Sequence, residues 1–221
     1  MAAQIPDRRR FVRQLVRHGG RGFAEEYGLP VLNNPANLYQ LLSLAQILRG
    51  SADHRRATAA ARALRDRGWN TAARMAASPD GERAAVLRAY DQRAAGTLAR
   101  RLGATAAALA ERYGGDPRRL RTAARRDPAA ERALLRELPG VDDGVVDLFF
   151  RDVQVLWPEI GPFADRNALT AARRLGLGSS AQDLADLTGR RESEKLAWLV
   201  GALARIELDG SYAQARQLAT A

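Results

Sequence analysis

Glycine and proline divide this chain into short segments in which apolar residues recur every three or four positions. The clearest segment starts at Asn34-Pro35 and ends at Gly50, and one helical face of it carries Leu38, Leu41, Leu42, Ala45 and Leu48. Alanine, leucine and arginine are strong helix formers, and runs of β-branched residues are short. The sequence therefore predicts an all-α fold.

The same apolar periodicity predicts further helices along the whole chain. They cover approximately residues 53–67, 71–77, 81–90, 92–102, 104–113, 128–137, 145–156, 167–175 and 192–208. Gly103 is expected to separate the fourth of these helices from the fifth. Ser180 and Asp183 are spaced as in a capping box, so they predict the start of one more helix.

The charge is strongly positive, with 35 Lys+Arg against 25 Asp+Glu and a formal net charge of +10. Lys195 is the only lysine, so nearly all of the cations are arginine. Such an excess favours a polyanionic partner, most simply nucleic acid, although an arginine- and alanine-rich composition can also reflect codon usage alone.

Composition excludes several kinds of chemistry. The chain has no cysteine and only two histidines, His18 and His54, so a cysteine nucleophile, a thiolate-held zinc ion and an iron–sulfur cluster are excluded. No nucleotide-binding glycine loop and no serine-hydrolase elbow is present. No cofactor and no metal are expected. The first residues lack the apolar core of a signal peptide and no stretch is apolar enough to span a bilayer, which predicts a cytoplasmic protein without a membrane partner.

Two segments suggest a function. Leu138-Pro139-Gly140-Val141 joins two predicted helices by a tight turn, and such a turn can direct backbone N–H groups and a helix N-terminus at a DNA phosphate. An ordinary connection between two helices is the alternative. Downstream, Asp165 follows apolar residues and precedes a helix, a position at which aspartate commonly acts as the N-cap. An N-cap role does not exclude a role in chemistry, because a capping carboxylate can also face a cleft.

The hairpin and the aspartate, in this order, resemble the helix–hairpin–helix DNA glycosylases of the endonuclease III superfamily. The matching segments are Leu138 to Val141, Phe163-Ala164-Asp165 and the following residues 173–177. Residues 41–46, which end in Gln46, and residues 90–94 are also similar to family segments. The resemblance spans roughly residues 33–177, and the order of these segments along the chain carries it.

The resemblance implies a two-lobed helical fold with a DNA-binding cleft. Its central domain would be residues 33–157, and its second lobe would combine residues 1–32 with 158–221. It implies a monomer that binds double-stranded DNA of the nucleoid, flips out a damaged or modified base, and hydrolyses the N-glycosidic bond with Asp165 as the catalytic carboxylate. The residues implied in DNA binding are Gln46, Pro139, Gly140, Val141, Asp142, Gly144, Arg93 and Arg166. Three aromatic residues are candidates to stack on the flipped base, namely Tyr39, Trp69 and Tyr27, and a position in the core or an interface is the alternative for each.

Three departures from the family pattern alter this expectation. Asp142 replaces the second hairpin glycine, and with Asp143 it puts negative charge beside the phosphate site. Gly144 stands where the lyase members carry a lysine, so base removal without strand cleavage is expected. The cysteines that hold the iron–sulfur cluster of many members are absent. Two other interpretations stay open: a catalytically inactive DNA-binding protein of the same fold, and a helical protein-interaction module.

Overall fold

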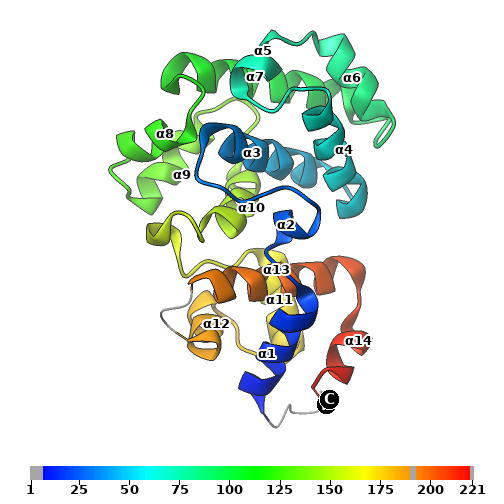
Figure 1. Cartoon of the computed structure of the whole chain (residues 1–221), viewed down its shortest axis with the longest axis vertical. Helices are drawn as coiled ribbons and strands as arrows, with labels where there is room; N and C mark the ends of the chain where they lie inside the picture. Colours follow the sequence, from blue (N-terminus) through cyan, green and yellow to red (C-terminus); the bar gives the residue numbers. More distant parts are fainter. Residues whose placement is uncertain (1–6, 190–192, 220–221) are drawn as a thin grey trace. The chain divides into compact units, whose positions relative to one another are not determined.

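The computed structural model describes residues 7–189 and 193–219, and within these ranges every regular element is a helix (Figure 1). The all-α prediction is therefore confirmed. No helix among the described residues combines the length and the apolarity that crossing a membrane requires.

The chain forms two compact units. The central unit comprises residues 27–149, and the terminal unit combines the chain up to Glu26 with the chain from Phe150 onward. The boundaries expected from the sequence, at 33 and 157, lie a few residues further along.

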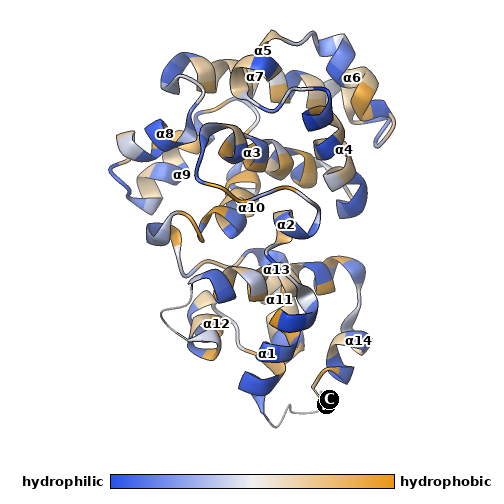
Figure 2. Cartoon of the chain, in the orientation of Figure 1, coloured by the Kyte–Doolittle hydropathy of each residue, from blue (hydrophilic) through white to orange (hydrophobic). Residues whose placement is uncertain are grey.

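The central unit contains seven complete helices in the described chain and the first part of an eighth. They are α3 (Pro35–Gly50), α4 (His54–Asp66), α5 (Ala72–Ala77), α6 (Asp80–Arg88), α7 (Ala95–Tyr113), α8 (Pro117–Ala123), α9 (Pro128–Arg136) and the start of α10 (Asp143–Val153). Five of them begin at a side chain that accepts an N–H of the first turn, namely Asn34, Asp53, Thr71, Asp116 and Asp127. Helix α7 packs against α3, α5 and α6, and buried leucines of α3 and α7 fill the core between them. Apolar residues in Figure 2 accordingly concentrate on α3 and α10, whereas α8 is largely hydrophilic.

The prediction of a helix break at Gly103 was wrong, because α7 continues through it to Tyr113. A Cβ at this position would collide with the guanidinium of Arg83, which is buried against α7 and donates to the carbonyl of Ala99. Glycine here makes room for a neighbouring side chain and does not end the helix.

The terminal unit is arranged around one long helix, α13 (Ser193–Asp209). The helices that pack on α13 are α1 (Arg8–Gly19), α2 (Phe23–Glu26), α11 (Arg166–Arg174), α12 (Ala181–Thr188) and α14 (Tyr212–Gln217). The short 3-10 helix η1 (Pro158–Ile160) precedes α11 in the chain. Gly201 of α13 allows α2 to approach closely, since a Cβ there would lie 2.7 Å from the backbone nitrogen of Phe23. The capping box predicted at Ser180 and Asp183 is present at the start of α12.

Candidate functional site

The predicted hairpin lies between α9 and α10. Gly140 has φ +80°, a left-handed conformation that favours glycine, and the N–H of Val141 donates to the carbonyl of Leu138 at 3.1 Å. Leu138 and Val141 are buried, whereas Pro139 and Gly140 are exposed. Two apolar side chains thus anchor the turn and leave its tip open to a ligand.

A carboxylate occupies part of the anion-binding position at this turn. Oδ1 of Asp142 accepts the N–H of Val145 at 2.9 Å, which is one of the N–H groups at the start of α10 that have no partner within the helix. A phosphate at this helix end would compete with Asp142 for the same positive region.

Three arginines surround the acidic residues of the hairpin. Arg49 pairs with Asp142 at 3.2 Å, Arg132 pairs with Asp143 at 3.2 Å and with Asp147 at 2.6 Å, and Arg136 pairs with Asp143 at 3.3 Å. The Arg49 side chain also lies over Gly144, where a Cβ would collide with it. These pairs are half exposed, so each contributes little to stability and can exchange with another anion. The cluster has equal numbers of arginines and aspartates and hence no net charge.

Gln46 holds the hairpin from the protein interior. Its buried Nε2 donates to Oγ1 of Thr105 at 2.6 Å and lies 3.3 Å from the carbonyl oxygen of Gly140. The hydroxyl of Thr105 contacts the carbonyl of Pro139 in turn. The side chain that the resemblance assigns to the gap left by a flipped nucleotide is therefore engaged with the hairpin backbone in this structure.

Replacement of Gln46 by methionine is expected to lower the free energy of unfolding by about 1–3 kcal/mol, because Thr105 and the Gly140 carbonyl lose a buried partner. Amide hydrogen exchange of the hairpin N–H groups should accelerate at the same time. Urea unfolding and exchange monitored by mass spectrometry measure the two effects. The control is Gln182→Met, which changes an exposed glutamine on α12. Equal effects of the two substitutions would contradict the role of Gln46.

Asp165 is the N-cap of α11, as its position before a helix predicted. Its Oδ1 accepts the N–H of Ala168 at 2.8 Å, and its Oδ2 accepts a hydrogen bond from Nη1 of Arg151, also at 2.8 Å. Asp165 is only 4% exposed and Arg151 only 1%. Both oxygens of the proposed catalytic carboxylate are thus engaged inside the terminal unit.

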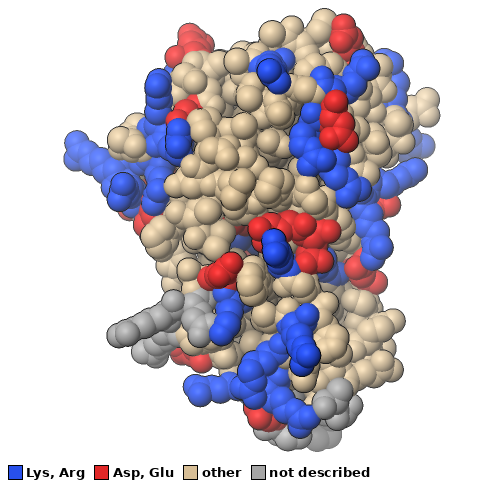
Figure 3. Space-filling model, viewed as in Figure 1, with Lys and Arg blue, Asp and Glu red and all other residues tan. Residues whose placement is uncertain are grey.

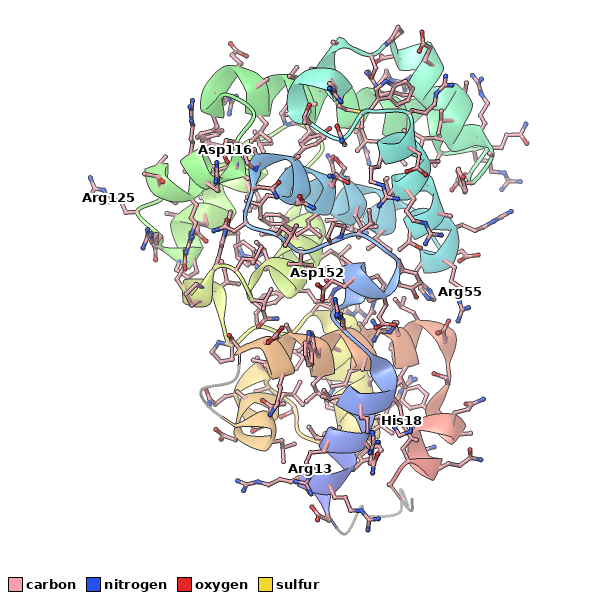
Figure 4. The ribbon with its side chains drawn as sticks, viewed as in Figure 1. Arg13, His18, Arg55, Asp116, Arg125 and Asp152 are labelled. Atoms are coloured by element: carbon pink, nitrogen blue, oxygen red, sulfur yellow. The ribbon has the colours of Figure 1, made fainter. Side chains whose placement is uncertain are left out.

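The buried charge network continues beyond this pair. Nη2 of Arg151 donates to Asp152 at 3.2 Å, and Asp152 also accepts the N–H of Ala24 at 3.1 Å, beside α2 in Figure 4. The guanidinium of Arg151 lies 3.8 Å from the centre of the Phe23 ring. Burial raises the pKa of the Asp152 carboxyl, and the charge of Arg151 opposes that increase. Arg151 therefore compensates two carboxylates and connects α2, α10 and α11.

The other residues named from the resemblance lie in different surroundings. Arg93 and Arg166 are exposed. Tyr39 is buried in the core, where burial raises the pKa of its hydroxyl, so no face is open to a base. The rings of Tyr27 and Trp69 are half buried, the first edge-on to His54 and the second within 5.7 Å of the guanidinium of Arg67.

Sequence patterns did not indicate which arginines decide the local chemistry. Arg151 is the one detectable exception, because it directly follows the apolar residues Leu148, Phe149 and Phe150. Arg49 and Arg132 lie on exposed or half-exposed helix faces like many other arginines of this chain.

No family model, curated protein or solved structure matches the chain. Within residues 7–189 and 193–219, no group of three or more histidine, aspartate or glutamate side chains is placed to hold a metal ion. The functional proposal consequently rests on the geometry of the chain's own residues.

Proposed function

We propose that this chain is a DNA-binding protein of the helix–hairpin–helix class that contacts duplex phosphates through the hairpin of its central unit and does not excise bases. The observation that carries the proposal is the exposed turn at Pro139 and Gly140, which two buried neighbours hold in place and three arginines flank. A glycine-containing turn before a helix N-terminus suits a phosphate and needs no contact with a base.

The distribution of positive charge also favours DNA as the partner. Most of the excess positive charge belongs to the central unit, which carries twenty arginines against thirteen acidic residues. Phosphate contacts supply most of the affinity of sequence-independent DNA binding, and arginine is well suited to them because its guanidinium donates two parallel hydrogen bonds. The arginines paired to Asp142 and Asp143 can transfer from carboxylate to phosphate without a change in the fold.

Base excision is the second candidate. It is favoured by the position of Asp165, which caps the first α-helix after the hairpin helix α10. Glycine at position 144 leaves this candidate without the hairpin lysine that a lyase step uses. It is disfavoured by the buried pair with Arg151, because a catalytic carboxylate has to approach the sugar whose bond it breaks.

A panel of duplexes carrying different damaged or modified bases separates the two candidates. The labelled strand is analysed after incubation with the protein, with and without alkali. The proposal predicts that every duplex is bound and that no strand breaks appear in either arm. Alkali-dependent breaks in any one duplex would establish glycosylase activity and contradict the noncatalytic assignment.

The acidic hairpin residues should weaken DNA binding. Replacement of both Asp142 and Asp143 by asparagine is expected to raise the affinity for a 20-base-pair duplex by roughly ten-fold at 0.1 M salt, because two negative charges leave the phosphate site. Asparagine at 142 can still cap α10. Fluorescence anisotropy of a labelled duplex measures the affinity.

The control for this substitution is Asp66→Asn with Glu111→Gln, which removes two exposed negative charges elsewhere in the central unit. If the hairpin contacts DNA, the control gains far less affinity. Equal gains in both variants would mean that only net charge matters and that the hairpin is not the contact.

A further inference from the structure

Helix α1 of the terminal unit carries a row of arginines on its exposed face. Arg9, Arg13 and Arg17 are four residues apart, so their side chains lie one above another on the same side of the helix. With a rise of about 1.5 Å per residue the row is about 12 Å long. All three are exposed, and Figure 3 shows a patch of basic side chains over this helix.

These arginines have no anionic partner within residues 7–189 and 193–219. None of the three forms a hydrogen bond or an ion pair through its side chain with any residue in the described part of the chain. The carboxylate of Asp7, at the start of the helix, accepts the backbone N–H of Arg10. The arginines of the hairpin differ in this respect, because each of them pairs with an aspartate. Three like charges at this spacing repel one another, and a bound anion would relieve that repulsion.

The opposite face of α1 shows that the row is not part of a membrane anchor. Phe11, Val12 and Leu15 are at most 2% exposed, and α1 packs against α12 and α13. A helix that lies in a bilayer surface needs a free apolar face, whereas the apolar face of α1 is buried inside the terminal unit. Its charged face is directed outward, as Arg13 illustrates in Figure 4. A polyanion held from outside by guanidinium groups is the ligand that fits these constraints.

We propose that Arg9, Arg13 and Arg17 form a second DNA-contact surface, which binds consecutive phosphates of one strand. One strand of a duplex presents a phosphate about every 3.4 Å along the axis, so a row of this length can contact about three of them. The surface belongs to the terminal unit and does not involve the hairpin. The inference rests on the proposed function only for the choice of duplex DNA as the ligand.

The test is the triple substitution Arg9→Gln, Arg13→Gln and Arg17→Gln in the full chain. Glutamine is a good helix former, so the midpoint of thermal unfolding should stay close to that of the unsubstituted protein. Affinity for a labelled 20-base-pair duplex is measured by anisotropy at several salt concentrations. The logarithmic salt slope should become shallower by about 2.7, since each lost phosphate contact contributes about 0.9, and affinity at 0.1 M salt should fall by roughly a hundred-fold.

The control removes the same number of positive charges from exposed arginines that already pair with carboxylates, by Arg112→Gln, Arg118→Gln and Arg174→Gln. Its salt slope should change by less than about one. Equal losses in the two triple variants would overturn the inference.

Two further outcomes separate this inference from the proposed function. If the α1 variant keeps the full salt slope while the hairpin substitutions at Asp142 and Asp143 still alter affinity, the second surface is refuted and the hairpin proposal stands. If instead the unsubstituted protein binds vesicles of anionic lipid but no duplex, and the α1 variant loses the vesicles, the row serves a membrane and both proposals fail.

Discussion

Replacement of Arg151 by methionine is expected to lower the free energy of unfolding by about 3–5 kcal/mol, because the loss of one member of a buried ion pair leaves the other charge uncompensated. Two carboxylates are affected here, those of Asp152 and Asp165, and both are almost completely buried. Packing against the Phe23 ring is also lost. For a chain of this length the unfolding midpoint should decrease by roughly 10 °C. Thermal unfolding followed by circular dichroism measures it.

The matched control is Arg88→Met, which removes an exposed arginine from α6 and should change the midpoint little. A second variant tests the mechanism directly. Substitution of Asp152 and Asp165 by asparagine in the Arg151→Met background removes the uncompensated charges and should restore part of the lost stability. A midpoint of Arg151→Met equal to that of Arg88→Met would show that the network does not stabilise the terminal unit.

Substitutions of Asp165 should lower the free energy of unfolding more when they remove both of its hydrogen bonds, to Ala168 and to Arg151, than when they keep one of them. Alanine removes both the N-cap of α11 and the partner of Arg151, and is expected to cost about 3–5 kcal/mol. Asparagine retains an oxygen that can accept the Ala168 N–H, so its cost should be about half as large. Urea unfolding of the two variants beside the unsubstituted protein measures the difference.

The opposite result has a clear meaning for function. A catalytic carboxylate that contributes to the reaction and not to the fold would be replaceable by asparagine without loss of stability, while any base release would disappear. Unchanged stability of both Asp165 variants would therefore contradict the structural role and favour the glycosylase interpretation.

Local sequence patterns predicted those features of the fold that depend on neighbouring residues. The helix start at Asn34-Pro35, the capping box at Ser180 and the cap at Asp165 each involve groups within a few positions of one another, and all are present. The break expected at Gly103 failed because its cause is tertiary, since the glycine makes room for Arg83 from another helix. Propensity alone does not include such a contact.

The partners in the candidate site lie far apart in sequence, and for this reason motifs could not reveal them. Gln46 donates a hydrogen bond to the carbonyl of Gly140, which lies 94 positions later in the sequence. Arg49 likewise donates to Asp142, which lies 93 positions later. Asp165 was identified by its place before a helix, but nothing near it in sequence indicates that Arg151 occupies its second oxygen. The motifs located the candidate residues, and only the tertiary structure showed what holds them.

Contact with duplex phosphates is the function that we propose for this chain. The most direct test is the affinity of the full chain for a duplex of about 20 base pairs, measured by fluorescence anisotropy at salt concentrations from about 50 to about 200 mM. Over this range the release of counterions from DNA changes the affinity strongly. We expect the logarithm of the association constant to fall linearly with the logarithm of the salt concentration, with a slope steeper than about −3. No binding at the lowest salt, or an affinity independent of salt, would contradict it.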